Sequence, residues 1–380
     1  MRIAVPTEVT PGETRVALVP KSVAQLVQAR AEVAVQAGAG ARAWIGDEGY
    51  QAAGATLAAD RATLLAGADC VVVVRRLPDS DVLAMREGAV LAGMLDPGND
   101  PGVLRPLIDR RITAFRLEAM PRISRAQDMD VLSSMSTLAG YHASVTAAAR
   151  LPRIFPLLMT AAGTLTPARV LVVGAGVAGL QAIATCKRLG AVVEAFDVRP
   201  AVREQVESLG ARYVETGAEA ETQQDAGGYA KALSQDAAER QHQVLSEHAR
   251  DADVVITTAL IPNQRAPILI TKEIVQSMKP GSVIVDLAAS AGGNCAYTEP
   301  DAEVTQNDVL ILGPTNSPAA IPGQASQLYS GNLTKFITLL LRDGDLHIDF
   351  DDVVMSQTCM THDGKPVGEQ MAALLAGAPA

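Results

Sequence analysis

The sequence has few aromatic residues and no long apolar run. Aromatic side chains make up 3% of its 380 residues, although 48% of the residues are hydrophobic. Its cores must therefore be built from Ala, Val, Leu and Ile. No run approaches the roughly 20 apolar residues that cross a bilayer. The N-terminal MRIAVPTEV has a strand pattern where a signal peptide would need a longer apolar segment. These absences predict a soluble, cytoplasmic protein with no membrane span of its own.

Clustered cysteines, metal-binding motifs and an excess of positive charge are also missing. The four cysteines lie far apart with no C-x-x-C, and the five histidines are scattered. We therefore expect reduced core thiols and no metal site. The balance of 32 basic against 42 acidic residues gives a net charge of −10. This charge argues against nucleic acid as a partner.

The most informative stretch is RVLVVGAGVAGLQAIATCKRLGAVVEAFD, from Arg169 to Asp197. It follows the order strand, glycine turn, helix, strand and acid. The glycines of its G-x-G-x-x-G are Gly174, Gly176 and Gly179. In dinucleotide-binding folds such glycines allow a tight turn, the approach of a pyrophosphate and close packing of helix on strand.

We therefore predict a dinucleotide site rather than a merely structural turn. The glycines would hold the pyrophosphate together with Val177 and Ala178, which open the predicted helix, because unpaired N–H groups at a helix start favour anions. Asp197 would accept hydrogen bonds from a ribose and repel a 2′-phosphate, which favours NAD. Arg199 blurs the choice between NAD and NADP, and we expect it to be a solvated arginine.

The rest of the chain alternates strand and helix, which predicts an α/β protein with two Rossmann-like domains of parallel sheet joined by long helices. The first domain would be discontinuous, formed by residues 1–135 with 325–380. The second would be the dinucleotide-binding domain, residues 136–324, including a connecting helix near Val131 to Leu151.

Three further elements are expected from local patterns. A helix is expected near Gly49 to Ala59, strands in LHIDFDDVVMSQTCM and a frayed tail in AALLAGAPA.

The segment PRISRAQDMDVLSS, from Pro121 to Ser134, is more polar than a structural loop needs to be. A nicotinamide carboxamide requires a donor such as Arg or Gln and an acceptor such as Asp or Gln. The alternative is helix capping, with a capping box at Ser124 to Gln127 and a cap at Asp130 or Ser133. Spacing alone leaves both interpretations open.

The segment TQQDAGGYAKAL contains two glycines followed by Tyr229. Such a loop could close over a ligand and exclude water, or it could be an ordinary flexible surface loop.

A general base is also missing from the first domain. There is no histidine before His142 and no lysine between Lys21 and Lys187. A dehydrogenase that oxidises an alcohol or amine needs a base for the departing proton. Hydride transfer between two nicotinamides needs no such base, and positioning alone can suffice.

Over essentially its whole length the chain resembles the NAD(H)-binding domain I of proton-translocating nicotinamide nucleotide transhydrogenase. The resemblance is carried by RIAVPTEVTPGETRVALVP, MPRISRAQDMDVLSS, the MTAAGT lead-in to the glycine turn, AGGYAKAL, KPGSVIVDLAASAGGNC and TCMTHDG. It implies that Arg122, Gln127, Asp130 and Ser133 surround the nicotinamide and its ribose. It also implies that Asp197 is the family's ribose-binding acid and that Tyr229 is its mobile-loop tyrosine.

The same resemblance implies a homodimer that binds NAD(H) and docks on a separate NADP(H)-binding domain. That domain would be attached to a membrane proton-channel subunit, which would hold this chain at the inner face of the plasma membrane.

Alanine dehydrogenase shares the R-V-A-L-x-P element, here Arg15 to Pro20, but uses a lysine and a histidine in its first domain. This chain has CVVVVRRLP without lysine and Met94 near the histidine position. Arg15 is then expected to form a structural ion pair. An alanine dehydrogenase-like enzyme and a non-catalytic NAD-binding module remain the alternatives.

Overall fold

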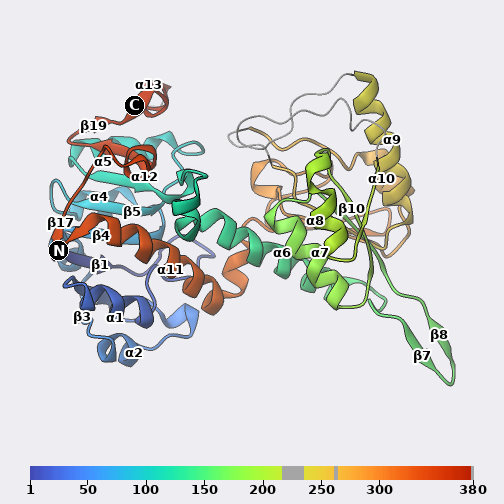
Figure 1. Cartoon of the computed structure of the whole chain (residues 1–380), viewed down its shortest axis with the longest axis horizontal. Helices are drawn as coiled ribbons and strands as arrows, with labels where there is room; N and C mark the ends of the chain where they lie inside the picture. Colours follow the sequence, from blue (N-terminus) through green and yellow to red (C-terminus); the bar gives the residue numbers. More distant parts are fainter. Residues whose placement is uncertain (216–234, 261–263, 378–380) are drawn as a thin grey trace. The chain divides into compact units, whose positions relative to one another are not determined.

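The computed structural model describes residues 1–215, 235–260 and 264–377. Its contacts divide the chain into two units, Met1–Met135 with Ala319–Ala380 and Ser136–Pro318. Each unit contains its own sheet with helices on both faces (Figure 1). Both units are therefore α/β layered structures, the fold class that the alternating pattern predicts.

Unit 1 is built, in its described part, on an eight-stranded sheet in the order β19-β18-β6-β5-β4-β1-β2-β3. Strands β1 to β6 pair in parallel, whereas β18 runs antiparallel to β6 and β19 antiparallel to β18. The strands are β1 (Arg2–Val5), β2 (Glu32–Gln36), β3 (Thr56–Ala58), β4 (Cys70–Arg75), β5 (Val90–Met94), β6 (Thr113–Arg116), β18 (Cys359–His362) and β19 (Lys365–Pro366).

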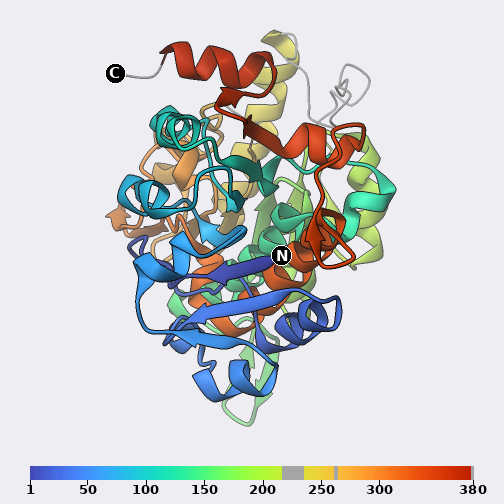
Figure 2. The ribbon, with the colours of Figure 1, turned by 90° about the vertical axis from the view of Figure 1, so that its left-hand side faces the viewer.

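Helices cover this sheet on both sides (Figure 2). The buried apolar cluster on one face unites strand residues with α3, α4, α5 and α13, while α1 packs against α11. The helices are α1 (Pro20–Gln28), α2 (Asp47–Ala52), α3 (Arg61–Ala66), α4 (Asp79–Ala84), α5 (Leu104–Asp109), α11 (Pro322–Leu340), α12 (Val353–Thr358) and α13 (Gly368–Gly377). A small hairpin, β16 (Leu341–Arg342) with β17 (Asp345–Leu346), follows α11.

Unit 2 contains a seven-stranded sheet in its described part, ordered β11-β10-β9-β12-β13-β15-β14, in which only β14 runs antiparallel to its neighbour. The strands are β9 (Arg169–Val173), β10 (Val192–Phe196), β11 (Arg212–Tyr213), β12 (Val254–Thr257), β13 (Val283–Asp286), β14 (Glu303–Gln306) and β15 (Val309–Leu312). The helices are α6 (Val131–Arg150), which begins in unit 1, α7 (Val177–Arg188), α8 (Arg203–Ser208), α9 (Gln235–Asp251) and α10 (Lys272–Ser277).

The apolar run of β9 explains why this strand lies at the centre of the sheet. Val170 and Val172 join the cluster formed with α6 and α7, while Leu171 and Val173 join the cluster formed with α9 and α10. Successive side chains of a strand point to opposite faces, so a strand covered on both faces needs apolar residues at every position.

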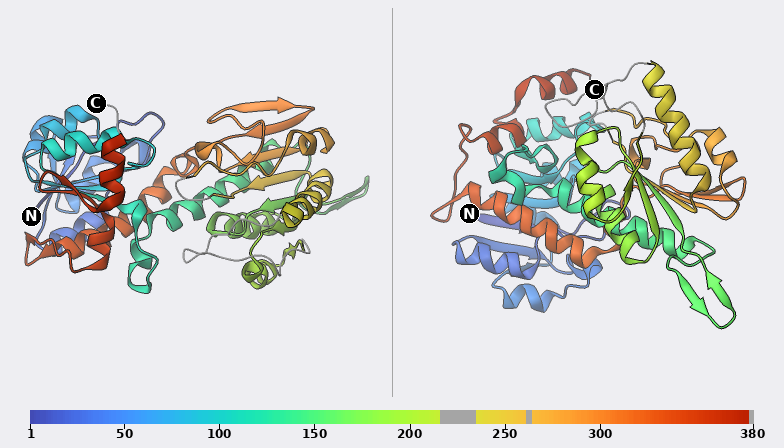
Figure 3. Two further views of the ribbon diagram at one scale, coloured as in Figure 1. Left: turned by 90° about the horizontal axis from the view of Figure 1, so that it is seen from above. Right: turned by 45° about the vertical axis from the view of Figure 1, so that its right-hand side comes forward.

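A two-stranded hairpin projects from unit 2 ahead of β9, clear of the sheet in both views (Figures 1 and 3). It consists of β7 (Leu158–Thr160) paired antiparallel with β8 (Gly163–Leu165), and every one of these residues is exposed. Met159 is 74% exposed. A hairpin of this kind is marginally stable alone in water.

Three local expectations were wrong. The helix expected near Gly49 to Ala59 ends at Ala52 and is followed by β3. In LHIDFDDVVMSQTCM, residues Val353–Thr358 form α12 where strand was expected, because the Asp352 side chain accepts N–H bonds from the start of that helix; the final Cys359 and Met360 enter a strand, β18, which does return to the unit 1 sheet. The C-terminal segment forms α13 and is anchored by the buried Met371, so it is not a frayed tail as far as Gly377.

Each of the four cysteines lies in the described part of the chain, buried and outside any disulfide, as expected. Burial raises the pKa of Cys70 and Cys359 to about 12 and that of Cys186 and Cys295 to about 11. Within the same residues, no helix is long and apolar enough to cross a membrane.

Candidate functional site

The glycine turn lies where the strand order of unit 2 reverses. The chain passes from β9 to β10 on one side, and the sheet continues from β9 to β12 on the other. Gly174 follows β9, and its carbonyl accepts the hydroxyl of Thr258, which follows β12, at 3.0 Å. In open α/β sheets ligands bind at the carboxyl ends of the strands at such a switch point.

Two of the three glycines are required by the backbone itself. Gly174 has φ +96°, a conformation that side chains rarely adopt. A Cβ on Gly179 would lie 1.8 Å from the carbonyl oxygen of Gly174, so only glycine permits this approach of helix and turn. Gly176 differs, because a Cβ built there meets nothing within 4 Å. Open space at Gly176 fits the need of a pyrophosphate to approach the main chain.

Helix α7 begins immediately after this open position. Gly176 is its N-cap residue and has no side chain to bond the first N–H groups, while its carbonyl accepts the N–H of Leu180 at 2.8 Å. The N–H groups at the start of the helix, near Val177 and Ala178, therefore need acceptors. A dinucleotide phosphate would supply such acceptors.

Asp197 comes from the end of β10 and lies beside the glycine turn. Its Oδ2 accepts the N–H of Ala175 at 2.7 Å, and the residue is 5% exposed. The hydroxyl of Tyr213 donates to its main-chain oxygen at 2.6 Å. The carboxylate is thus held next to the predicted pyrophosphate position, where the ribose of the same nucleotide would lie.

The expectation of a solvated Arg199 was wrong. Its guanidinium pairs with the Asp197 carboxylate at 2.9 Å, and its side chain is 24% exposed. Pro200 follows directly and favours the extended backbone seen at Arg199 (φ −96°, ψ 111°), from which the side chain turns back onto Asp197.

Sequence reasoning missed two polar residues, Asn294 and Asp286, near the carboxyl ends of the strands of unit 2. The side chain of Asn294 accepts the N–H of Ala259 at 3.0 Å and donates to the carbonyls of Ala259 and Pro267, each at 2.9 Å. Asp286, at the end of β13, is completely buried. The available signal was the polar residue that ends the apolar run VIVD, since such a position faces the ligand edge of a parallel sheet.

The second predicted group belongs to unit 1. Residues Ser124–Met129 form the short helix η4, and the buried Ala126 and Met129 anchor it. The Asn332 side chain on α11 donates to the carbonyl of Asp128 at 2.8 Å, and Arg125 pairs with Asp352 at 2.7 Å. The turn is therefore fixed to α11 and to the start of α12.

Asp130 caps the connecting helix α6. Its Oδ1 accepts the N–H of Ser133 at 2.9 Å and its Oδ2 accepts the Ser133 hydroxyl at 2.5 Å. The capping interpretation of Asp130 is confirmed, whereas the proposed capping box is wrong, because Ser124 lies inside η4 and the cap position is Ile123. Arg122 and Gln127 are exposed.

The structure thus brings together Asp130 and Ser133 in unit 1 and the glycines with Asp197 in unit 2. Tyr229 lies outside the described residues.

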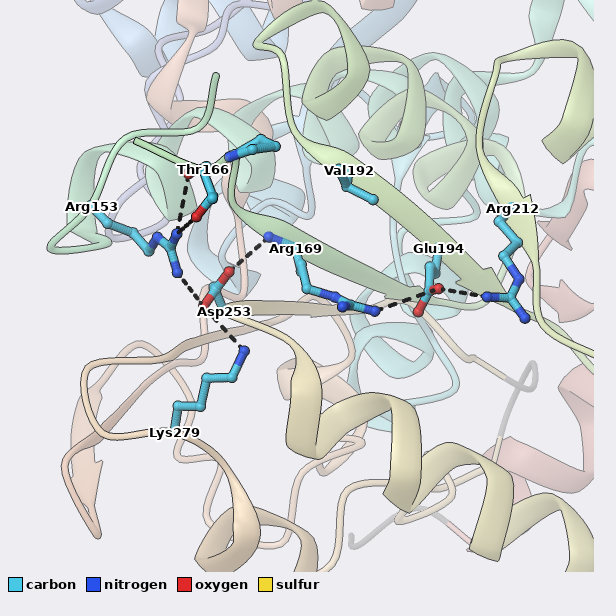
Figure 4. A pocket seen from close by; sticks show the side chains of 9 residues that line it. Arg153, Thr166, Arg169, Val192, Glu194, Arg212, Asp253 and Lys279 are labelled. Carbon is cyan, nitrogen blue, oxygen red and sulfur yellow. Dashed lines mark hydrogen bonds and ion pairs between the residues drawn. The ribbon is translucent and has the colours of Figure 1, made fainter. Parts of the chain in front are cut away.

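A cavity of about 580 Å³ lies at the opposite edge of the unit 2 sheet (Figure 4). Arg169, Val192 and Arg212 begin three of its strands, and Asp253 precedes a fourth. Arg153 and Lys279 approach Asp253 at 2.9 and 3.5 Å. Because the glycine turn follows the carboxyl ends of the strands, this ion-paired cavity is separate from the predicted dinucleotide site.

Arg15 forms the structural ion pair that we expected. Its guanidinium contacts the Glu13 carboxylate at 2.6 and 2.7 Å, and both side chains are buried.

Glu8 lies in the same region of unit 1 and accepts the N–H groups of Val74 and Arg75. Burial raises the pKa of Glu8 to about 7.

A glycine turn at the switch point, with an acid at the end of the next strand, defines a dinucleotide-binding protein of the Rossmann-like class. Residues 4–139 match the family model described as alanine dehydrogenase/PNT, N-terminal domain, and residues 143–369 match the C-terminal domain of the same family. The chain belongs to this alanine dehydrogenase/PNT family, and its relatives at 40% identity or more include NAD(P) transhydrogenase alpha subunits.

The chain is 49% identical over 373 residues to the first part of NAD(P) transhydrogenase subunit alpha of Rhodospirillum rubrum, covering 96% of this chain and 97% of that one. A solved transhydrogenase from Sinorhizobium meliloti matches with a TM-score of 0.88 and 40% identity, covering 97% of this chain and 100% of that one. The alanine dehydrogenase of Mycolicibacterium smegmatis is more distant, at 29% identity over 381 residues, covering 98% of this chain and 96% of that one.

Proposed function

We propose that this chain is the NAD(H)-binding subunit of a proton-translocating transhydrogenase. It exchanges hydride between its own NADH and NADP⁺ on a partner domain, and the exchange is coupled to proton movement in a membrane subunit. One observation carries the proposal: Asp197 bonds the N–H of Ala175 at 2.7 Å, beside an open Gly176. The ribose and the pyrophosphate of one dinucleotide therefore have adjacent partners.

On this proposal the polar turn of unit 1 serves the nicotinamide end. Arg122 and Gln127 orient the carboxamide, while Asp130 and Ser133 fix the ribose and the turn itself. When bound, the reduced nicotinamide supplies the hydride. On the same proposal Tyr229 contributes to coenzyme binding.

The absence of lysine and histidine from β4 and β5 supports hydride exchange between two nicotinamides. Arg75 and the buried Met94 stand at the ends of β4 and β5; a guanidinium carries only donors, and a thioether is a weak acceptor. Exchange between two nicotinamides releases no proton at the reacting carbon. Correct positioning is then the main catalytic requirement.

We further propose a homodimer that is held at the inner face of the plasma membrane by its partner subunits. The exposed apolar side chains of Leu158, Met159 and Leu165 on the hairpin β7–β8 support an interface on unit 2. The names of the relatives, which describe subunits or portions of subunits, support separate partners.

The test combines the full chain with NADH and the NADP(H)-binding subunit of a transhydrogenase, and follows reduction of an NADP⁺ analogue by absorbance. We expect exchange that requires both proteins. Robust NADH formation from NAD⁺ and alanine without a partner would instead identify an amino-acid dehydrogenase. NADH binding without exchange would identify a non-catalytic module.

Two variants sharpen this test. Arg122→Ala should slow the exchange more than it weakens NADH binding, because its proposed contact orients the ring. Arg105→Ala removes an exposed arginine of the same unit and serves as the control. Equal losses of binding and exchange in Arg122→Ala would point to simple anchoring.

A further inference from the structure

The four acceptor positions of the Asp197 carboxylate are occupied by this chain itself. Its Oδ1 accepts the main-chain N–H of Arg199 at 2.8 Å and the Arg199 Nε–H at 2.9 Å. Its Oδ2 accepts the Ala175 N–H at 2.7 Å and the Arg199 Nη2–H at 2.9 Å. A carboxylate has about four lone-pair sites. A ribose hydroxyl can therefore bond Asp197 only after one of these donors leaves.

The donors differ in their freedom to leave. The N–H of Ala175 is fixed by the glycine turn, and the N–H of Arg199 is fixed by the extended backbone before Pro200. The guanidinium sits at the end of a side chain with several rotatable bonds and is partly exposed to solvent. The guanidinium is thus the donor that can be displaced.

We propose that Arg199 sets coenzyme specificity by competing with the ribose for the Asp197 carboxylate. The proposal rests on the NAD(H) site proposed above. In the absence of coenzyme the guanidinium covers the carboxylate, and NADH binding must displace it. The wild-type chain therefore binds NADH more weakly than it would if only the N–H groups of Ala175 and Arg199 contacted the Asp197 carboxylate.

The displaced guanidinium also lowers discrimination between the two coenzymes. A bare carboxylate repels a 2′-phosphate, whereas an arginine nearby accommodates one. Because Arg199 is only two residues from Asp197, its charge stays close to the 2′ position after displacement. Arg199 thus weakens NADH binding and makes NADPH binding less unfavourable.

The test measures dissociation constants of NADH and NADPH for the full chain and for Arg199→Ala, by titration calorimetry. Alanine keeps the main-chain N–H, so two donors still orient Asp197 and two acceptor positions become free. We expect NADH to bind about 2- to 10-fold more tightly, the range given by about one net hydrogen bond. NADPH should bind more weakly than to the wild-type chain.

Two further variants complete the design. Arg188→Ala removes the same charge at the far end of α7 and controls for net charge. Arg199→Lys keeps the charge without the two-point contact, and its NADH affinity should fall between those of wild type and Arg199→Ala.

The outcomes separate this proposal from the one on which it rests. A wild-type chain that bound no NADH would end both. NADH binding by the wild type, combined with unchanged or weaker NADH binding by Arg199→Ala, would overturn the competition alone and make Arg199 a support for Asp197. Equal gains for NADH and NADPH would overturn the specificity role.

Discussion

Asp286 accepts the main-chain N–H of Asn294 at 2.7 Å, which ties the end of β13 to the loop that follows it. The same carboxylate accepts two further N–H groups and two threonine hydroxyls, from Ala288, Cys295, Thr257 and Thr298. Asn294 in turn holds the segment after β12. A single buried carboxylate thus organises the loops next to the glycine turn.

Asp286→Asn should destabilise the protein by about 3–5 kcal/mol. The substitution replaces one carboxylate oxygen by an NH2 group, which cannot accept hydrogen bonds, so buried N–H and O–H groups lose their acceptor. The measurement is the free energy of unfolding in urea. Asp251→Asn, at the exposed end of α9, is the matched control. A loss no larger than that of the control would show that Asp286 does not organise these loops.

The second and third glycines of the turn should respond differently to the same substitution. Gly179→Ala places a Cβ 1.8 Å from a carbonyl oxygen, so we expect a lower melting temperature. A Cβ at position 176 has no atom within 4 Å, and Gly176 has an ordinary φ of −76°, so the melting temperature of Gly176→Ala should stay that of the wild type. NADH binding should nevertheless weaken, because the new methyl group stands where the pyrophosphate approaches. Unchanged NADH affinity in Gly176→Ala would place the phosphates elsewhere.

Glu8 should make unit 1 less stable as the pH rises. Burial raises the pKa of Glu8 from 4.5 to about 7. Between these values the folded state binds more protons than the unfolded state, so the free energy of unfolding falls with increasing pH. The expected contribution is roughly 3 kcal/mol.

Glu8→Gln removes the titrating group, so the fall in stability between about pH 5 and about pH 8 should become smaller than in the wild type. The measurement is urea unfolding at both pH values. Glu32→Gln, an exposed glutamate of the same unit, is the control. Identical pH dependence of Glu8→Gln and wild type would contradict the prediction.

The hairpin β7–β8 should be required for dimer formation. Met159→Glu combined with Leu165→Glu places charge on its exposed apolar surface, so we expect monomers by analytical ultracentrifugation. Leu83→Glu is the control, because Leu83 is 55% exposed in unit 1 and Leu165 is 52% exposed. A double variant with the same mass in solution as the wild type would place the interface elsewhere.

The central strands and the glycine turn could be predicted because their signals are local. Apolar runs such as Val170–Val173 are typical of strands covered on both faces, and three glycines at fixed spacing constrain one turn. The connecting helix was also predicted, and α6 runs from Val131 to Arg150.

The remaining features depend on contacts that spacing does not reveal. The bond between Asp197 and Arg199 depends on the side-chain direction after Pro200. Helix α12 contains Val353 and Val354, which favour strands, and the cap at Asp352 overrides that preference. The organising role of Asp286 depends on donors that come from the last residue of β12 and from the segment after β13.

The buried thiols make the molecule convenient for site-directed spectroscopy. Their raised pKa values leave very little thiolate at neutral pH, and thiolate is the species that reacts with alkylating reagents. A cysteine introduced at an exposed position, such as Ala162 in the hairpin turn, would therefore take up a fluorophore or spin label selectively in the native background. Distances between labels in a mixed assembly could then be read without first removing any native cysteine.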